Sequence, residues 1–142
     1  MSDTDKPKQT LVAGADILGA VLRPHGYKFR LENEGKGSGG YFASGSFRKD
    51  DRRLELHFRY SLGLVTYHIG NCSLDHETYM RCLGVYGHNQ YPDFPAEPME
   101  SFHHLTEDLQ NYCSDFVAGD GRQFQALAAS FREDPERFKG IH

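Results

Sequence analysis

The chain has 142 residues, a length that suits one folded domain. Hydrophobic residues make up 38% of the sequence and aromatic residues 13%, which is too apolar for a disordered protein. No apolar run is long enough to span a bilayer. The formal net charge is −4, and the acidic patch within residues 82–121 disfavours contact with nucleic-acid phosphates.

The cysteine content indicates a reducing compartment. There are three cysteines, an odd number, and no CxxC pair, which argues against a disulfide framework and against a zinc ribbon. We therefore expect a cytoplasmic protein.

The N-terminal part of the chain predicts a tail and then a helix. Residues 1–9 are polar and are predicted to be a disordered tail, and residues 10–142 are predicted to form a single domain. Thr10 can cap a helix whose apolar residues recur at helical spacing, namely Leu11, Ala15, Leu18 and Leu22. Pro24 and Gly26 are expected to end this helix.

Four runs of alternating polar and apolar residues predict four β-strands, within residues 27–31, 41–48, 53–60 and 65–69. A two-residue turn at Asp50-Asp51 places small residues of the second run opposite large residues of the third. The resulting pairs are Phe47 with Leu54, Gly45 with Leu56, Ala43 with Phe58, and Tyr41 with Tyr60. The alternation predicts one buried set and one outward set: Leu54, Leu56, Phe58 and Tyr60 inside, and Arg53, Glu55, His57 and Arg59 outside.

The connection between the third and fourth runs leaves two registers open. A turn at Leu62-Gly63 would place His57 opposite His68, whereas a turn at Ser61-Leu62 would place Glu55 opposite His68. Both registers keep the same residues on each face. The runs therefore predict an antiparallel meander with one apolar face, which requires a cover.

Helices in the second half of the chain are expected to supply that cover. Ser73 or Asp75 can cap a short helix that ends at Gly84, and three prolines make residues 85–99 irregular. Apolar spacing predicts a long amphipathic helix over residues 102–117 and another helix over residues 124–131. The fold class is thus α+β: an N-terminal helix, a four-stranded antiparallel meander, and two to three helices packed on one sheet face.

The short motifs do not indicate a catalytic or metal-binding protein. Residues 35–40 match GxGxxG, but a strand follows them where a dinucleotide site needs a helix, so a hairpin loop is the better interpretation. His57 and His68 could hold an ion only weakly, with Glu55 nearby. Cys72, just before a helix start, is a minor candidate nucleophile without an identifiable base. We expect no catalytic residue, no structural metal ion and no cofactor.

The charge distribution points to a partner-binding surface. Residues 82–121 contain no Lys or Arg but seven acids: Asp93, Glu97, Glu100, Glu107, Asp108, Asp115 and Asp120. Aromatic residues in the proline-rich part of this segment could anchor a protein partner, and the acids would steer one with a basic surface. The candidate partner-binding residues are Tyr91, Asp93, Phe94, Glu97, Glu107 and Asp108. In the alternative interpretation, the aromatic residues fold back over the core and the acids form an ordinary solvated helix face.

The outer face of the predicted sheet is the alternative site. It would bind a small molecule or a metal, or carry acid–base chemistry through Glu55 and His57. Its candidate residues are Phe42, Ser44, Glu55, His57, Arg59 and His68. In the competing interpretation, these residues form the wet side of a one-faced antiparallel sheet.

The segment Leu22-Arg23-Pro24-His25-Gly26-Tyr27-Lys28-Phe29, where a helix breaks into the first strand, carries a resemblance in layout. The order of elements is similar to that of small uncharacterised bacterial α+β domains and of immunity proteins of bacterial toxin systems. This resemblance implies a cytoplasmic, non-catalytic protein that binds and neutralises a cognate toxin. It carries over no functional residue, because such families share a layout rather than a site.

Overall fold

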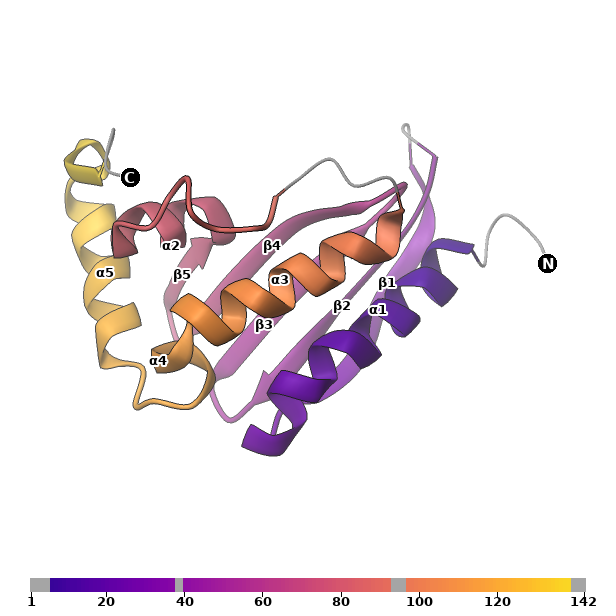
Figure 1. Ribbon diagram of the computed structural model, residues 1–142, viewed down its shortest axis with the longest axis horizontal. Coiled ribbons are helices and arrows are strands. Elements are labelled where there is room, and N and C mark those ends of the chain that lie inside the picture. Colours follow the sequence, from indigo (N-terminus) through magenta and orange to yellow (C-terminus); the bar gives the residue numbers. More distant parts are fainter. Residues whose placement is uncertain (1–5, 38–39, 93–96, 139–142) are drawn as a thin grey trace.

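The computed structural model describes residues 6–37, 40–92 and 97–138 (Figure 1). The first half contains α1 (Lys6–Leu22), the 3-10 helix η1 (Arg23–His25), β1 (Lys28–Gly37), β2 (Gly40–Lys49), β3 (Arg52–Phe58) and β4 (Leu62–Ile69). The second half contains β5 (Cys72–Asp75), α2 (His76–Leu83), α3 (Pro98–Tyr112), α4 (Ser114–Val117), α5 (Arg122–Glu133) and the 3-10 helix η2 (Pro135–Phe138). The α+β class and the antiparallel sheet are confirmed.

The strands form one antiparallel sheet in the order β1-β2-β3-β4-β5. The predicted register between β2 and β3 is confirmed for three pairs: Phe47 with Leu54, Gly45 with Leu56, and Ala43 with Phe58. Asp50 and Asp51 connect the two strands, and Asp50 has a positive φ of 52°. Asp tolerates this left-handed conformation better than most residues, so the dipeptide suits a tight turn.

The described helices gather on one face of the sheet (Figure 1). Helix α3 crosses the middle of that face, α1 lies next to it over β1 and β2, and α2, α4 and α5 lie toward the β5 side. A side chain at Gly14 of α1 would collide with the Phe102 ring of α3, because a Cβ there would lie 2.5 Å from the ring. Gly14 therefore allows the two helices to approach closely. The opposite face of the sheet, which we call the outer face, is left uncovered by the described helices.

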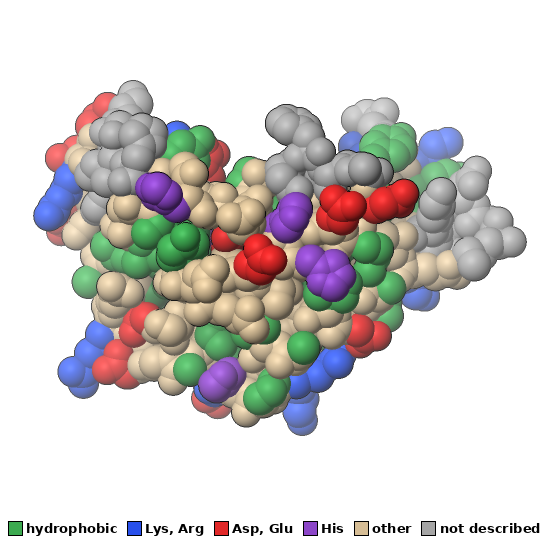
Figure 2. Space-filling model, in the orientation of Figure 1, with side chains coloured by type: hydrophobic (Ala, Val, Ile, Leu, Met, Phe, Trp, Pro, Cys, Tyr) green, Lys and Arg blue, Asp and Glu red, His purple; other side chains and the backbone are tan. Residues whose placement is uncertain are grey.

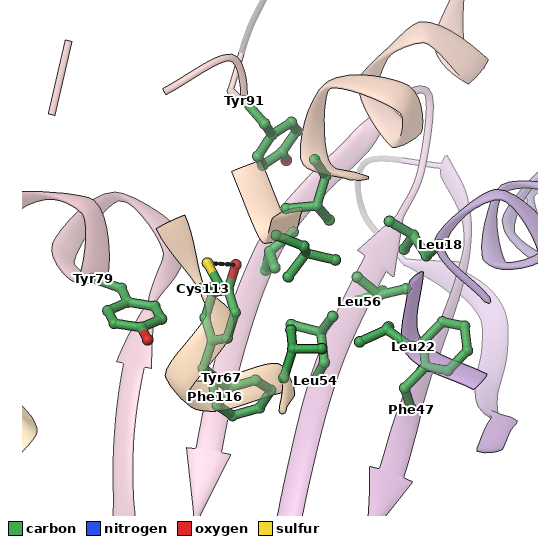
Figure 3. Packing of buried hydrophobic residues seen from close by; sticks show 14 of the residues in the cluster. Leu18, Leu22, Phe47, Leu54, Leu56, Tyr67, Tyr79, Tyr91, Cys113 and Phe116 are labelled. Carbon is green, nitrogen blue, oxygen red and sulfur yellow. Dashed lines mark hydrogen bonds between the residues drawn. The ribbon is translucent and has the colours of Figure 1, made fainter. Parts of the chain in front are cut away.

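The core lies between the helices and the inner face of the sheet (Figure 3). Leu18 and Leu22 of α1 approach Phe47, Leu54 and Leu56 of the sheet, and all five side chains are buried. Tyr67, Phe116 and Phe124 form a second group of rings, with centroids 4.9 Å apart between Tyr67 and Phe116. Burial of each such side chain stabilises the fold by about 1.5–3 kcal/mol before entropic costs.

Several of the helix boundaries differ from the prediction. Helix α1 begins at Lys6 rather than Thr10, so residues 6–9 of the predicted tail are helical. Pro7 fits the first turn of a helix, where its missing N–H is not needed, and Lys8 pairs with Glu34 at 3.9 Å. The predicted helix over residues 102–117 is divided at Cys113 into α3 and α4, and α3 already begins at Pro98, within residues 85–99 that were expected to be irregular. Proline is accommodated at a first helical position, where its missing N–H is not needed.

The connection between β3 and β4 corrects the predicted register. Residues 59–61 form the turn, and β4 already begins at Leu62, so His68 lies opposite Arg53 and Glu55 lies opposite Thr66. Neither predicted register is correct. Leu62 and Val65 are both buried, and the pairing shifts by one residue between Leu56, opposite Val65, and Phe58, opposite Leu62. The two faces are nevertheless as predicted up to Phe58. Tyr60 was expected inside, but it lies in the turn and is 75% exposed.

The segment between β4 and α2 also differs in part. Residues 72–75 pair with β4 as a fifth strand, which the four alternating runs did not predict. The predicted cap is confirmed: the Asp75 side chain accepts a hydrogen bond from the Thr78 N–H at 2.7 Å, and Gly84 ends α2. None of the described helices combines the length and the apolar character that a membrane crossing requires.

Candidate functional site

The exposed side of α3 carries the acids of the predicted partner surface. Glu97, Glu100 and Glu107 are exposed, and their spacing of three and seven residues places them on one stripe of the helix. We call these three residues the acidic stripe. Figure 2 shows acidic and histidine side chains gathered over α3, whereas Lys and Arg side chains lie at the margins of this face.

The charges of the acidic stripe are not neutralised within the described part of the chain. None of the three carboxylates forms an ion pair there, and residues 82–121 contain no Lys or Arg. Only the position near the N-terminus of α3 favours Glu97 and Glu100, through the helix dipole. Glu107 lies beyond the reach of that effect, so its charge faces solvent uncompensated.

Asp108 is a correction to the predicted surface, because it faces the core and is 0% exposed. Its Oδ1 accepts a hydrogen bond from the Gln90 N–H at 2.7 Å, and its Oδ2 accepts one from the Tyr91 N–H at 2.8 Å. His76 Nε2 lies 2.9 Å from the same Oδ2. A buried carboxylate with three donors is a structural anchor, and this one ties residues 90–91 to α3.

Tyr91 is likewise a core residue rather than an exposed anchor. Its side chain is 4% exposed, and its hydroxyl donates to the carbonyl of Leu62 at 2.9 Å. The alternative interpretation, in which the loop aromatic folds back over the core, is correct for this residue. The predicted contacts Asp93 and Phe94 lie outside the described residues. Glu97 and Glu107 are therefore the two predicted partner-binding residues that the structure places at the surface.

The carboxylate of Asp115 also has a structural task. Its Oδ2 accepts a hydrogen bond from the Phe124 N–H at 2.9 Å, near the start of α5. This bond directs Asp115 toward the backbone of the neighbouring helix. Among the described acids of residues 82–121, Asp108 and Asp115 thus hold backbone N–H groups of other segments, whereas Glu97, Glu100 and Glu107 are exposed.

Behind Asp108 lies a buried polar chain that the sequence analysis missed. It runs from Asp108 through His76 to the Tyr67 hydroxyl, 2.7 Å from His76 Nδ1, and on to Cys113 Sγ at 3.7 Å. Figure 3 shows the contact between Tyr67 and Cys113. Because both Asp108 oxygens already accept from backbone N–H groups, we assign the His76 proton to Nε2, and Nδ1 then accepts from the Tyr67 hydroxyl. Each member therefore has its partner inside the protein.

The hydrogen-bonded side chains of Asp108, His76, Tyr67 and Cys113 are closed off from solvent, and this determines their chemistry. Burial raises the pKa of the Cys113 thiol to about 12 and raises the pKa of Tyr67 well above its usual value. Both groups therefore stay protonated at neutral pH and are poor nucleophiles. His76 is 3% exposed, so a substrate has almost no access to the imidazole. Asp108 and His76 are the residue types of a catalytic Asp-His pair, but here their hydrogen bonds hold buried groups of the core together.

The outer face of the sheet brings together the six residues of the alternative site. Phe42, Ser44, Glu55, His57, Arg59 and His68 all lie on it, and all are partly exposed. The rings of Phe42 and His57 stack with centroids 5.5 Å apart, and the Arg59 guanidinium lies 5.9 Å from the Phe42 centroid. The face is therefore as predicted, although its pairing differs.

The charged groups on the outer face pair with one another. Glu32 contacts both Arg48 and Arg53, with 3.0 Å between its carboxylate and Arg53, and Glu55 contacts Arg53 at 3.4 Å and His68 at 3.0 Å. Partial burial alone would raise the pKa of Glu32, but hydrogen bonds from Arg53, Arg48 and Ser46 hold that pKa below its ordinary value. The acids of this face are thus already satisfied.

The histidines on this face are not brought together as a metal site would require. His57 lies opposite Ser44, and His68 lies opposite Arg53 and Ser73. Across residues 6–37, 40–92 and 97–138, no group of three or more His, Cys, Asp or Glu side chains could hold an ion.

All three cysteines are free thiols, and burial raises the pKa of Cys82 to about 11.

Comparisons with known proteins do not add a relationship. No family model matches the chain, and neither the curated proteins nor the solved structures gave a match. The site and fold described above therefore carry the functional argument.

Proposed function

We propose that this protein is a non-catalytic binding domain whose partner is a protein with a basic surface, and that the acidic stripe of α3 is where the partner first makes contact. The observation that carries the proposal is that Glu97, Glu100 and Glu107 are exposed along one side of α3 and that none of them forms an ion pair within the described residues. Exposed acids without an ion-pair partner among the described residues leave a negative field on this face, which attracts a basic partner.

The contrast with the other acids supports this proposal. Asp75, Asp108 and Asp115 accept backbone hydrogen bonds, and Glu32 and Glu55 are paired with arginine. These residues have tasks within the fold. Within residues 6–37, 40–92 and 97–138, no ion pair involves the acidic stripe, and removing its charge is expected to leave stability almost unchanged.

A non-catalytic role is supported by the state of the most chemically suggestive groups. His76, Asp108 and Cys113 are enclosed in the core, and each is hydrogen-bonded to another member of the buried chain. A general base needs to reach a substrate proton, either directly or through a single water molecule. The enclosed imidazole does not meet that requirement.

The finer form of the proposal concerns the identity and location of the partner. We propose a cognate toxin as the partner, in keeping with the layout shared with immunity proteins, and the cytoplasm as the compartment. The three free thiols agree with a reducing compartment. The two experiments below test separately whether α3 binds a basic partner and whether that partner is a cognate toxin.

The first experiment locates the surface with a defined probe. Octalysine is titrated into the isotope-labelled protein at low salt, and amide chemical shifts are followed by NMR. We expect the largest changes around Glu100 and Glu107, and we expect added salt to suppress them. Changes centred on the outer face of the sheet, with α3 unaffected, would contradict the proposed surface.

The second experiment tests the partner itself. Binding of the purified product of the adjacent gene is measured by association kinetics for the wild type and for the double variant Glu100→Lys, Glu107→Lys. Charge reversal is expected to lower the association rate about tenfold at low salt, because steering is lost. The control is Glu133→Lys, Asp134→Lys, which makes the same charge change at two exposed positions near the end of α5.

The kinetic outcomes separate the two forms of the proposal. Equal slowing by both double variants would indicate a general charge effect and would contradict a surface on α3. Absence of binding by the adjacent gene product would contradict the cognate-toxin form.

A further inference from the structure

A cavity of about 480 Å³ opens at one end of the sheet. It lies where the β1–β2 hairpin, the β3–β4 turn and the first turns of α1 and α3 meet, and the two helices contribute Pro7 and Pro98 to it. Its volume is in the range of small-molecule sites, which are typically concave and mostly apolar. This cavity is separate from the outer-face ion pairs and from the buried polar chain around Asp108.

Aromatic rings form much of the cavity wall. Tyr41, Phe58 and Tyr60 line it, and Tyr60 is 75% exposed although it is a large side chain. The Tyr60 hydroxyl crosses directly over Gly40, where a Cβ would lie 2.5 Å from it, and Gly40 has a φ of 109°. Glycine therefore permits both the turn and the close approach of the ring. A planar ligand placed here would bury the exposed ring.

The charged residues that line the cavity are cationic. Lys36 places its Nζ 5.4 Å from the Tyr41 ring centroid, and Arg59, the second cation of the lining, has its guanidinium carbon 5.9 Å from the Phe42 ring centroid. Among the described residues, neither cation pairs with a carboxylate, and no Asp or Glu lines the cavity. Glu34 is two residues from Lys36, but it pairs with Lys8.

We infer that this cavity binds a small organic anion that contains a planar ring, with the ring against Tyr41 and Tyr60 and the acid group near Lys36. Aromatic carboxylates, sulfonates and phosphate esters share this chemistry. Rings stack on tyrosine, and an unpaired ammonium in a partly apolar hollow attracts an anion more strongly than a fully solvated one does. The acidic stripe plays no part in this binding, so the inference is independent of the proposed protein partner.

The test uses two fluorescent probes that differ mainly in charge. 1-Anilinonaphthalene-8-sulfonate carries a sulfonate, and N-phenyl-1-naphthylamine has the same ring system without it. The dissociation constant of each probe is measured by fluorescence for the wild type, Lys36→Met, Tyr60→Ala and Arg30→Met. Arg30 is exposed on the same strand as Lys36 but outside the cavity, so Arg30→Met is the matched control.

The inference predicts a specific pattern. The wild type binds the sulfonate more tightly, and Lys36→Met weakens sulfonate binding about tenfold while leaving the neutral probe unchanged. Tyr60→Ala weakens both probes, and Arg30→Met changes neither. Each variant is melted first, and both Lys36 and Tyr60 are exposed enough that folding is expected to persist.

Three results would overturn the inference. They are no binding of either probe by the wild type, equal affinity for the charged and neutral probes, and sulfonate binding that is unchanged by both Lys36→Met and Tyr60→Ala. The first would remove the site, the second its preference for anions, and the third its location.

Discussion

The two sides of helix α3 use the same chemical group for opposite purposes. On the buried side, Asp108 accepts hydrogen bonds from two backbone N–H groups and from His76. On the exposed side, the neighbouring Glu107 has no ion-pair partner in the described part of the chain. The comparison shows that a run of acids is not one feature: the phase of the helix decides which carboxylates stabilise the fold and which are free to contact a partner.

The outer face of the sheet stands between these extremes. Its acids are partly exposed, like those of the acidic stripe, but they are paired, like Asp108. Surface ion pairs contribute little stability individually, whereas a network around one carboxylate contributes more. The fold should therefore depend strongly on Asp108, less on the paired acids of the outer face, and least on the acidic stripe. Mutation of each carboxylate and measurement of the free energy of unfolding can test this order.

The largest effect is expected on the buried side of α3. Asp108→Ala should lower the free energy of unfolding by about 3–5 kcal/mol, because it leaves His76 and two buried N–H groups without an acceptor. Glu107→Ala is the matched control and should change it by no more than about 0.5 kcal/mol. Chemical denaturation of both variants measures the difference. Similar losses from the two variants would abolish the distinction between the sides.

The next effect concerns the buried chain that extends from Asp108. Tyr67→Phe should lower the free energy of unfolding by about 1–3 kcal/mol, because His76 Nδ1 loses its donor in a site without water access. Tyr112→Phe is the control, since the Tyr112 hydroxyl bonds the His88 carbonyl at 3.3 Å where solvent can replace it. Thermal melts of the two variants compare them. A Tyr67→Phe protein with an unchanged free energy of unfolding would mean that these buried hydrogen bonds contribute little to stability.

A smaller, pH-dependent effect is expected on the outer face. Because the folded-state pKa of Glu32 is lowered, its stabilisation is fully present above the ordinary glutamate pKa and is lost as pH falls through the folded value. Glu32→Gln should therefore cost roughly 1 kcal/mol at neutral pH, and the cost should shrink toward zero as the pH falls below about 4. Glu34→Gln, at an exposed 3.9 Å pair, is the control. A cost for Glu32→Gln that stays constant with pH would contradict the ion-pair explanation.

Some of this architecture was predictable from the sequence, because local patterns determine it. The alternation in β3 identified the inner face, and the Asp50-Asp51 turn fixed the register with β2. The sequence offered two candidate caps for α2, Ser73 and Asp75, and Asp75 is the one that caps the helix. In each case residues close in the sequence set the geometry.

The candidate site was harder to predict, because long-range contacts decide it. Asp108 lies three residues after Leu105 and one before Leu109, so the helical spacing already placed it on the buried side of α3. The sequence prediction placed it outside because charged residues are usually exposed. His76 has the same property, three residues before buried Tyr79. The division of the helix at Cys113 and the four-residue strand β5 had no comparable signal in the sequence.

The most direct test of the account is carbodiimide labelling of carboxylates in the folded protein, read residue by residue by mass spectrometry. The account predicts rapid labelling of Glu100 and Glu107 and no labelling of Asp108 until the protein is unfolded. The unfolded protein supplies the control, because all three carboxylates should then react at similar rates. Labelling of Asp108 at the rate of Glu107 in the folded protein would contradict the division of α3 into a structural side and a binding side.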